Sequence, residues 1–149
     1  MTTFNLARST SPSAGPSRNE AYGGVLMRKV VNFSGIIQAN SGTTSIATTD
    51  LIRAFAIPPN SVMLFCGAHV QETAVSGAFT ISAASILYAS GHMSVSGDVD
   101  NKFPLSTSGT IFTSASAVDV YLTLTSGSAI AGKVVVYAYV IPPFGAAGT

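Results

Sequence analysis

Apolar and polar side chains alternate with a period of two along much of this sequence, and that pattern limits its fold more than any other feature. Residues 118–125 show it most clearly. Successive side chains of an extended strand point to opposite faces, so one face of this segment is apolar and the other polar. The alternation predicts a strand that turns one set of residues toward a core, namely Val118, Val120, Leu122 and Leu124, and that exposes Asp119, Tyr121, Thr123 and Thr125.

Residues 132–141 alternate in a different way, because both faces of the predicted strand are apolar. One face carries Val134, Val136, Ala138 and Val140, and the opposite face carries Val135, Tyr137, Tyr139 and Ile141. A strand that is apolar on both sides in an antiparallel protein needs cover besides its own core. Either face could be the core face, and either a loop or a neighbouring subunit could cover the other. We assign Val135, Tyr137, Tyr139 and Ile141 to a subunit interface.

Other short segments rich in β-branched and aromatic residues are separated by Gly, Ser, Asn and Pro. The pattern predicts strands at residues 27–33, 36–39, 51–57, 61–73, 78–82, 86–88 and 110–113. Within 61–73, the predicted core face comprises Val62, Leu64, Cys66, Ala68 and Val70. Residues 48–53 form the one weak helical candidate. Many short strands with such turns are typical of an antiparallel sandwich or barrel.

The first 21 residues differ in composition from the rest, because residues 2–19 are rich in Ser, Thr and Pro. Such a segment is predicted to be an extended arm without a core of its own. We therefore divide the chain into an N-terminal arm (1–21), a β-sandwich domain (22–141) and a C-terminal tail (142–149). The arm either is solvated or docks on a partner, and its candidate docking residues are Phe4, Leu6, Arg8, Arg18 and Tyr22.

Charge is sparse in this chain. Charged residues make up 9% of it, and the net charge is +1, whereas an ordinary soluble domain has about 25%. General nucleic-acid binding requires a clustered basic face, so we do not expect it. No apolar run has the length of a signal peptide or a membrane span, so we expect synthesis in the cytoplasm and no membrane association. The low charge also favours a surface that partners partly cover.

Residues able to support catalysis are few. The only histidines are His69, on a predicted strand, and His92, in a predicted turn, and no nucleophile motif accompanies either. Residues 98–101 (Asp-Val-Asp-Asn) offer oxygen ligands for Ca²⁺ but lack the Gly and Glu of a complete calcium loop. Cys66 lies on an apolar face, which favours a buried, unreactive thiol. We expect no enzymatic activity, no cofactor, no metal and no small-molecule ligand.

Carboxylate pairs of the glycosidase kind are the remaining catalytic alternative. Glu72 with Asp50 or Asp119 would be such a pair. The chain has no Trp for stacking on sugars and only six acidic residues, which argues against this reading.

Three segments resemble a known family. They are residues 50–62 (DLIRAFAIPPNSV), in which an acidic residue opens a strand that ends in Ile-Pro, and residues 118–124 (VDVYLTL) and 131–136 (AGKVVV). These segments are similar to small β-sandwich proteins of tailed bacteriophages, the capsid decoration or cement proteins. The resemblance extends over residues 25–141 and does not include the arm. Related sequences often carry a Gly-Asp-rich turn where this chain has residues 81–86 (ISAASI).

The resemblance implies an antiparallel β-sandwich with a jelly-roll-like arrangement that assembles as a homotrimer and clamps neighbouring major capsid subunits on the outside of the head. The expected partners are therefore other copies of this chain and the major capsid protein, and the expected location is the exterior of the virion. Two alternatives remain. One is another virion component, such as a tail, fibre or jelly-roll coat subunit. The other is a carbohydrate-binding module, in which tyrosines would stack on sugars: Tyr88, Tyr121, Tyr137 and Tyr139.

Overall fold

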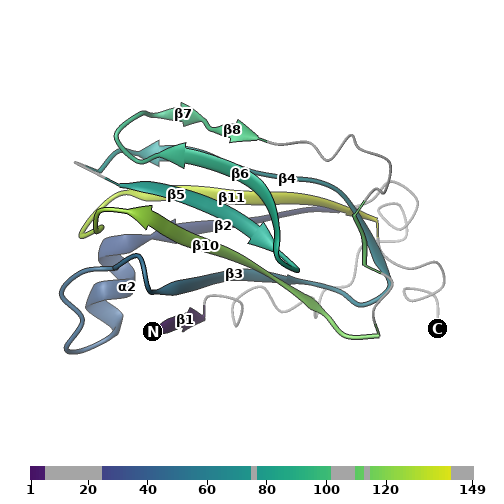
Figure 1. Ribbon diagram of the computed structural model, residues 1–149, viewed down its shortest axis with the longest axis horizontal. Helices are drawn as coiled ribbons and strands as arrows, with labels where there is room; N and C mark the ends of the chain where they lie inside the picture. The colour runs from purple at the N-terminus through teal and green to yellow at the C-terminus, as the bar shows by residue number, and fades with distance from the viewer. Residues whose placement is uncertain (6–24, 75–76, 102–109, 113–114, 142–149) are drawn as a thin grey trace.

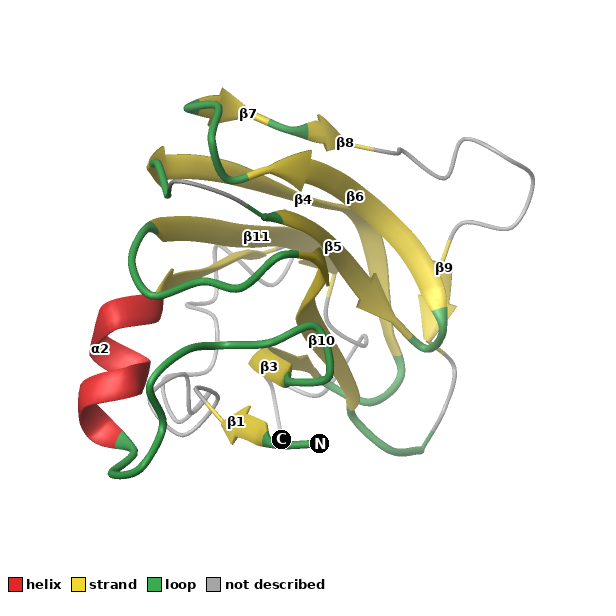
Figure 2. Ribbon diagram, turned by 60° about the vertical axis from the view of Figure 1, so that its left-hand side comes forward, coloured by secondary structure: helices red, strands yellow, loops and turns green. Residues whose placement is uncertain are grey.

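Two β-sheets packed face to face form the protein (Figures 1 and 2). The computed structural model describes residues 1–5, 25–74, 77–101, 110–112 and 115–141. Sheet A contains, in spatial order, β1 (Thr3–Asn5), β3 (Leu51–Ile57), β10 (Val118–Ser126), β5 (Ala78–Ala83), β6 (Ile86–His92) and β8 (Asp100–Asn101). Sheet B contains β2 (Val25–Asn32), β11 (Lys133–Ile141), β4 (Ser61–Glu72) and β7 (Gly97–Asp98), and β9 (Thr110–Phe112) also pairs with β4. The predicted all-β sandwich is confirmed, whereas the jelly-roll arrangement stays a prediction.

Alternating residues of the central strands fill the space between the sheets. The core face of β10 is the predicted one, since Val120, Leu122 and Leu124 are at most 1% exposed. In β11, Val134, Val136, Ala138 and Val140 are at most 2% exposed. The core face of β11 is therefore the Val136 face, and Val135, Tyr137, Tyr139 and Ile141 lie on the outside of sheet B.

A bulge in β4 changes which of its residues face the core. Met63 pairs with Val140 and Phe65 pairs with Tyr139, so Leu64 is the extra residue. Met63 is buried and Leu64 is 49% exposed. The prediction that Val62 and Leu64 face the core with Cys66 is wrong, because an extra residue reverses the alternation on one side of the bulge.

One predicted strand is a helix. Residues 36–39 belong to α2 (Phe33–Ala39), and Asn32 caps its first turn by accepting a hydrogen bond from the Gly35 backbone N–H (3.2 Å). Phe33 and Ile36 are buried, and their spacing of three residues places them on one helical face. The strand predicted at residues 51–57 is confirmed as β3, so the weak helical candidate at residues 48–53 is excluded over residues 51–53, which pair with β10.

The first residues of the chain belong to sheet A instead of forming a free arm. Strand β1 pairs in parallel with β3, and Phe4 is 4% exposed within the core. The prediction that Phe4 is an accessible docking residue is therefore wrong, since its ring fills the sandwich. Leu6, Arg8, Arg18 and Tyr22, like the tail at 142–149, lie outside the described residues.

Residues 97–101 connect the edges of the two sheets. Strand β7 pairs with β4 in sheet B and β8 pairs with β6 in sheet A, and both strands run along one side of the sandwich in Figure 1. Between them, Val99 packs so closely on β6 that a Cβ atom at Gly91 would lie 2.5 Å from its Cγ1 atom. Residues 98–101, which the sequence offered as an incomplete Ca²⁺ loop, thus belong to two short strands and the residue between them.

Candidate functional site

The outward side of sheet B is a continuous apolar surface, which we call the outer face. Cross-strand pairing places Leu26, Tyr139 and Phe65 in one row across β2, β11 and β4. The next rows are Arg28, Tyr137 and Gly67, then Val30, Val135 and His69. Directly paired residues of antiparallel strands point to the same side of a sheet. The four residues predicted for an interface therefore lie beside apolar residues from two other strands.

Several side chains of the outer face are open to solvent although they are large and apolar. Leu26 is 58% exposed, Val30 39% and Ile141 37%, while Leu64 in the adjacent bulge is 49% exposed. Single exposed apolar residues are normal on proteins, but contiguous patches mark sites of interaction. Strand β11 has nine residues, so the outer face is about 30 Å long and, over three strands, about 14 Å wide.

Three aromatic rings on the outer face pack against one another. The rings of Phe65 and Tyr139 are stacked, with centroids 5.7 Å apart and an angle of 8° between their planes. The ring of Tyr137 meets Phe65 edge-on, with a centroid distance of 6.2 Å and an angle of 74°. Aromatic pairs in these geometries contribute about 0.5–1.5 kcal/mol beyond their buried area. The rings are therefore held in place before any partner arrives.

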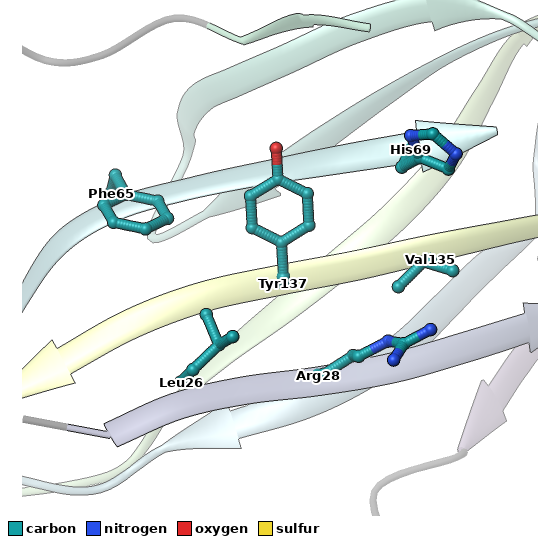
Figure 3. Close-up of a pocket in the computed structure, with 6 residues that line it drawn as sticks. All are labelled: Leu26, Arg28, Phe65, His69, Val135 and Tyr137. Atoms are coloured by element: carbon teal, nitrogen blue, oxygen red, sulfur yellow. The ribbon is translucent and has the colours of Figure 1, made fainter. Parts of the chain in front are cut away.

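A groove of about 410 Å³ lies beside two of these rings, those of Phe65 and Tyr137. It is lined by Leu26, Arg28, Phe65, His69, Val135 and Tyr137, and Figure 3 shows the ring of Tyr137 standing between Phe65 and His69. Tyr137 is paired on β4 with Gly67, which carries no side chain. The polar groups of the groove are Arg28, His69 and the Tyr137 hydroxyl.

An ion pair marks one end of the outer face. Lys133 Nζ lies 2.6 Å from Glu72 Oε2, and both side chains are more than a third exposed. Exposed ion pairs of this kind contribute little to stability. The ion pair therefore marks where the apolar surface ends. It also engages the carboxylate of Glu72, which a glycosidase-type carboxylate pair would require.

The outer side of sheet A carries a polar network. Arg53 donates from Nε to Asp119 Oδ1 (2.7 Å), and the Tyr121 hydroxyl donates to Asp119 Oδ2 (3.2 Å). Burial, followed by the charge of Asp119, raises the pKa of Tyr121. Asp119 thus joins β10 to β3 through Arg53, and its second oxygen is engaged by Tyr121 of the same strand, as expected of a structural network.

The other candidate reactive groups are dispersed or buried. Burial raises the pKa of the Cys66 thiol from 9.0 to about 12, so the reactive thiolate is scarce at neutral pH. His69 lies on the outer face, whereas His92 ends β6 in sheet A. Over the ranges that the structure describes, no group of three or more His, Cys, Asp or Glu residues could hold a metal ion. Within those ranges, no helix is long and apolar enough to cross a membrane.

The sequence matches no protein-family model, and neither a curated protein nor a solved structure matches it. Function must therefore be argued from the residues of the outer face and their surroundings.

Val135, Tyr137, Tyr139 and Ile141 come together on the outer face, while their role at a subunit interface stays a prediction. Sequence reasoning missed the contribution of β2, because the predicted strand began at Met27. The signal was present in the alternation of Leu26, Arg28 and Val30 with the inward residues of β2.

The tyrosines considered for sugar stacking do not form one site. Tyr88 is buried and Tyr121 lies on sheet A. Only Tyr137 and Tyr139 share a face.

Proposed function

We propose that this chain is a structural virion protein that decorates a phage capsid by binding major capsid subunits, and that it does so as a homotrimer. The observation that carries the proposal is the outer face of sheet B, which is apolar, preformed and open to solvent. The phage assignment is supported by the sequence resemblance of residues 50–62, 118–124 and 131–136. In this proposal the outer face is buried between copies of the chain.

A second copy of the chain is the occupant that best fits the character of the outer face. Among the described residues, Arg28 is the one side chain with a permanent charge that lines the groove, and 9% of the whole chain is charged. A highly charged partner would leave buried charges unpaired, which is costly. A copy of this same chain brings an equally uncharged surface.

The edge of sheet B supports the same conclusion. Strand β2 is the last strand in the order of sheet B and has eight residues. A long edge strand with exposed apolar residues promotes uncontrolled pairing unless something covers it. A cyclic trimer joins two different patches of each subunit, and the outer face with the adjacent β2 edge supplies two.

The aromatic groove favours one other function, carbohydrate binding. Tyr137, Tyr139 and Phe65 offer ring surfaces next to two polar groups, and β-sandwiches host many unrelated binding sites. A glycan array separates the two functions, because specific binding that disappears in Tyr137→Ala would favour the carbohydrate module.

Two measurements test the proposal. Light scattering on the eluting protein at micromolar concentration should give a molar mass three times the 15.2 kDa of one chain. The protein should also sediment with undecorated heads assembled from the major capsid protein of the same phage. A monomer would contradict the trimer, and a trimer that stays in the supernatant would contradict decoration but not self-association.

A further inference from the structure

Strand β1 is attached to the sandwich in a way that differs from every other described strand. It has three residues and forms the only parallel pair among the described strands, with β3. It lies at the edge of sheet A, next to β3 (Figure 2). Residues 6–24 separate it from β2 in the other sheet. No short loop joins β1 to the next strand, so noncovalent contacts hold it in its place in the core.

The start of β3 forms a specific slot for these first residues. The Leu51 N–H donates to the Thr2 carbonyl (2.9 Å), and the Thr2 N–H donates to Asp50 Oδ1 (3.2 Å). The other carboxylate oxygen of Asp50 accepts from the Ala47 N–H (2.9 Å). Phe4 fills the core beside this slot and is 4% exposed. The slot therefore recognises both the backbone and the Phe side chain of the N-terminal segment.

Strand β1 also borders a hollow in the surface. The hollow has a volume of about 430 Å³ and is lined by Thr3 and Phe4 from β1, by residues of β2 and by residues of α2, including Lys29, Asn32, Gly35 and Ile36. Among the described strands, β1 pairs with β3 alone, so only one of its edges is held by another strand.

The connecting segment is long enough to reach another subunit. Its 19 residues (6–24) can span about 65 Å when fully extended, whereas a domain of this size has a radius of gyration of about 15 Å. By its length alone, this connection allows the strand to reach the slot of an adjoining copy as well as its own. Slots on copies held in contact can therefore compete for it.

We propose that β1 is an exchangeable strand: in the assembled protein, residues 2–5 of one copy occupy the β3 slot of the next copy. This inference rests on the proposed self-association, because a strand can cross only between chains that are held together. In a closed ring each copy gives one strand and receives one, so no slot is left empty. The interactions that β1 gives up within its own chain are made again between chains.

Cysteines at paired positions test the exchange directly. Thr3 and Leu51 are directly paired and lie on the outer side of sheet A, and adjacent strands bring paired Cα atoms within reach of a disulfide. A tagged Thr3→Cys chain and an untagged Leu51→Cys chain are refolded together at the assembly concentration and oxidised. Exchange predicts a covalent dimer of tagged and untagged chains, at least tenfold above the level in either variant alone. The Thr3→Cys/Leu51→Cys double variant should give covalent dimers and trimers on a non-reducing gel.

The matched control uses the opposite neighbour of β3. Leu51 is also paired with Thr123 on β10. Strands β3 and β10 both lie inside sheet A, with a neighbouring strand on each side. Leu51→Cys/Thr123→Cys should therefore give only a bond within one chain. A photo-crosslinking residue at Thr3, which is exposed, provides the same readout if the double variant misfolds.

Light scattering on the same samples separates the two proposals. If the Thr3→Cys/Leu51→Cys variant is a trimer whose disulfide bonds all lie within single chains, strand exchange is overturned and self-association stands. A monomer with bonds only within chains would overturn both.

Discussion

Val136 and Tyr137 are neighbours on β11 but face opposite sides of sheet B, so the same substitution should have different consequences at each. Val136 is 0% exposed in the core between the sheets. Tyr137 lies on the outer face and lines its groove. We predict that Val136→Asp severely destabilises the fold, whereas Tyr137→Asp yields a folded subunit that associates much more weakly.

The expected cost at Val136 follows from its burial. Removing a fully buried Val side chain forfeits about 1.5–3 kcal/mol of apolar burial. Leaving a carboxylate uncompensated in the core costs about 3–5 kcal/mol more. A domain has a total stability of about 5–15 kcal/mol. The two costs together, about 4.5–8 kcal/mol, are a large part of that margin and exceed it for a domain at the low end of the range.

The cost at Tyr137 within one subunit is smaller. The substitution mainly removes the edge-on packing of its ring against Phe65, which together with partial burial amounts to about 1–2 kcal/mol. A destabilisation of that size lowers the melting temperature of a domain this long by about 3–8 °C. In the assembly, however, the new carboxylate would be buried beside the cross-strand Arg28 and against the apolar surface of a second copy, so association should be strongly weakened.

Urea unfolding and light scattering together measure both effects. Tyr137→Phe keeps the ring and should retain the trimer, and Thr125→Asp adds the same charge at an exposed position of β10 and should change neither property. A trimeric Tyr137→Asp variant would show that the outer face is not the interface. A folded Val136→Asp variant with normal stability would refute the assignment of the core face.

Phe4, Cys66 and Tyr121 each support a separate prediction. Phe4→Ala should lower the free energy of unfolding by about 3–5 kcal/mol. Urea denaturation measures this, with a substitution at an exposed position, Thr3→Ala, as the control. An unchanged urea midpoint would show that β1 is not part of the core. Because the pKa of Cys66 is raised from 9.0 to about 12, a thiol reagent should react only after unfolding. The stability contributed by this neutral thiol is complete below pH 9 and disappears as pH rises toward 12, so urea midpoints that stay constant across that window would contradict it. Asp119→Asn should lower the raised pKa of Tyr121 only in part, because burial is its largest cause; tyrosinate absorbance during alkaline titration measures this, and an unaltered pKa would exclude a contribution from the carboxylate.

Alternation in the sequence was sufficient to predict the sandwich and most of its strands. Leu51–Ile57 has the predicted bounds, and residues 118–125 differ from β10 by one residue. These segments are correctly predicted because one face of each is buried, so that the hydrophobic pattern itself fixes the register. Where the burial pattern is interrupted, the same reasoning fails.

The errors have local physical causes. The bulge at Leu64 shifts the alternation of β4 without a neighbouring Gly or Pro to signal it. The helix after Asn32 was missed because Ile36 and Ile37 suit a strand equally well, and the cap at Asn32 decides between the two. Short apolar runs of this length are ambiguous between helix and strand.

The N-terminal strand was missed for a different reason. The segment around Phe4 is largely polar and shows no alternation of apolar and polar residues from which the burial of Phe4 could be predicted. Its place depends on the slot formed by Asp50 and Leu51, almost fifty residues away. Contacts between such distant residues are not visible in local sequence, and the same limit hid which strands lie on either side of β11.

The arrangement of charge connects the two proposals. Arg53 with Asp119 and Lys133 with Glu72 form ion pairs, and the carboxylate of Asp50 accepts hydrogen bonds from backbone N–H groups. The Arg53–Asp119 pair and Asp50 stabilise β3, β10 and the β1 slot, and the Lys133–Glu72 pair lies at one end of the outer face. These charges therefore do little to keep the outer face soluble. Because an apolar face with few charges is stabilised mainly by burial, self-association through sheet B is the outcome that the arrangement favours. The β1 slot lies on sheet A, and a strand exchanged there would reinforce that association without competing for the outer face.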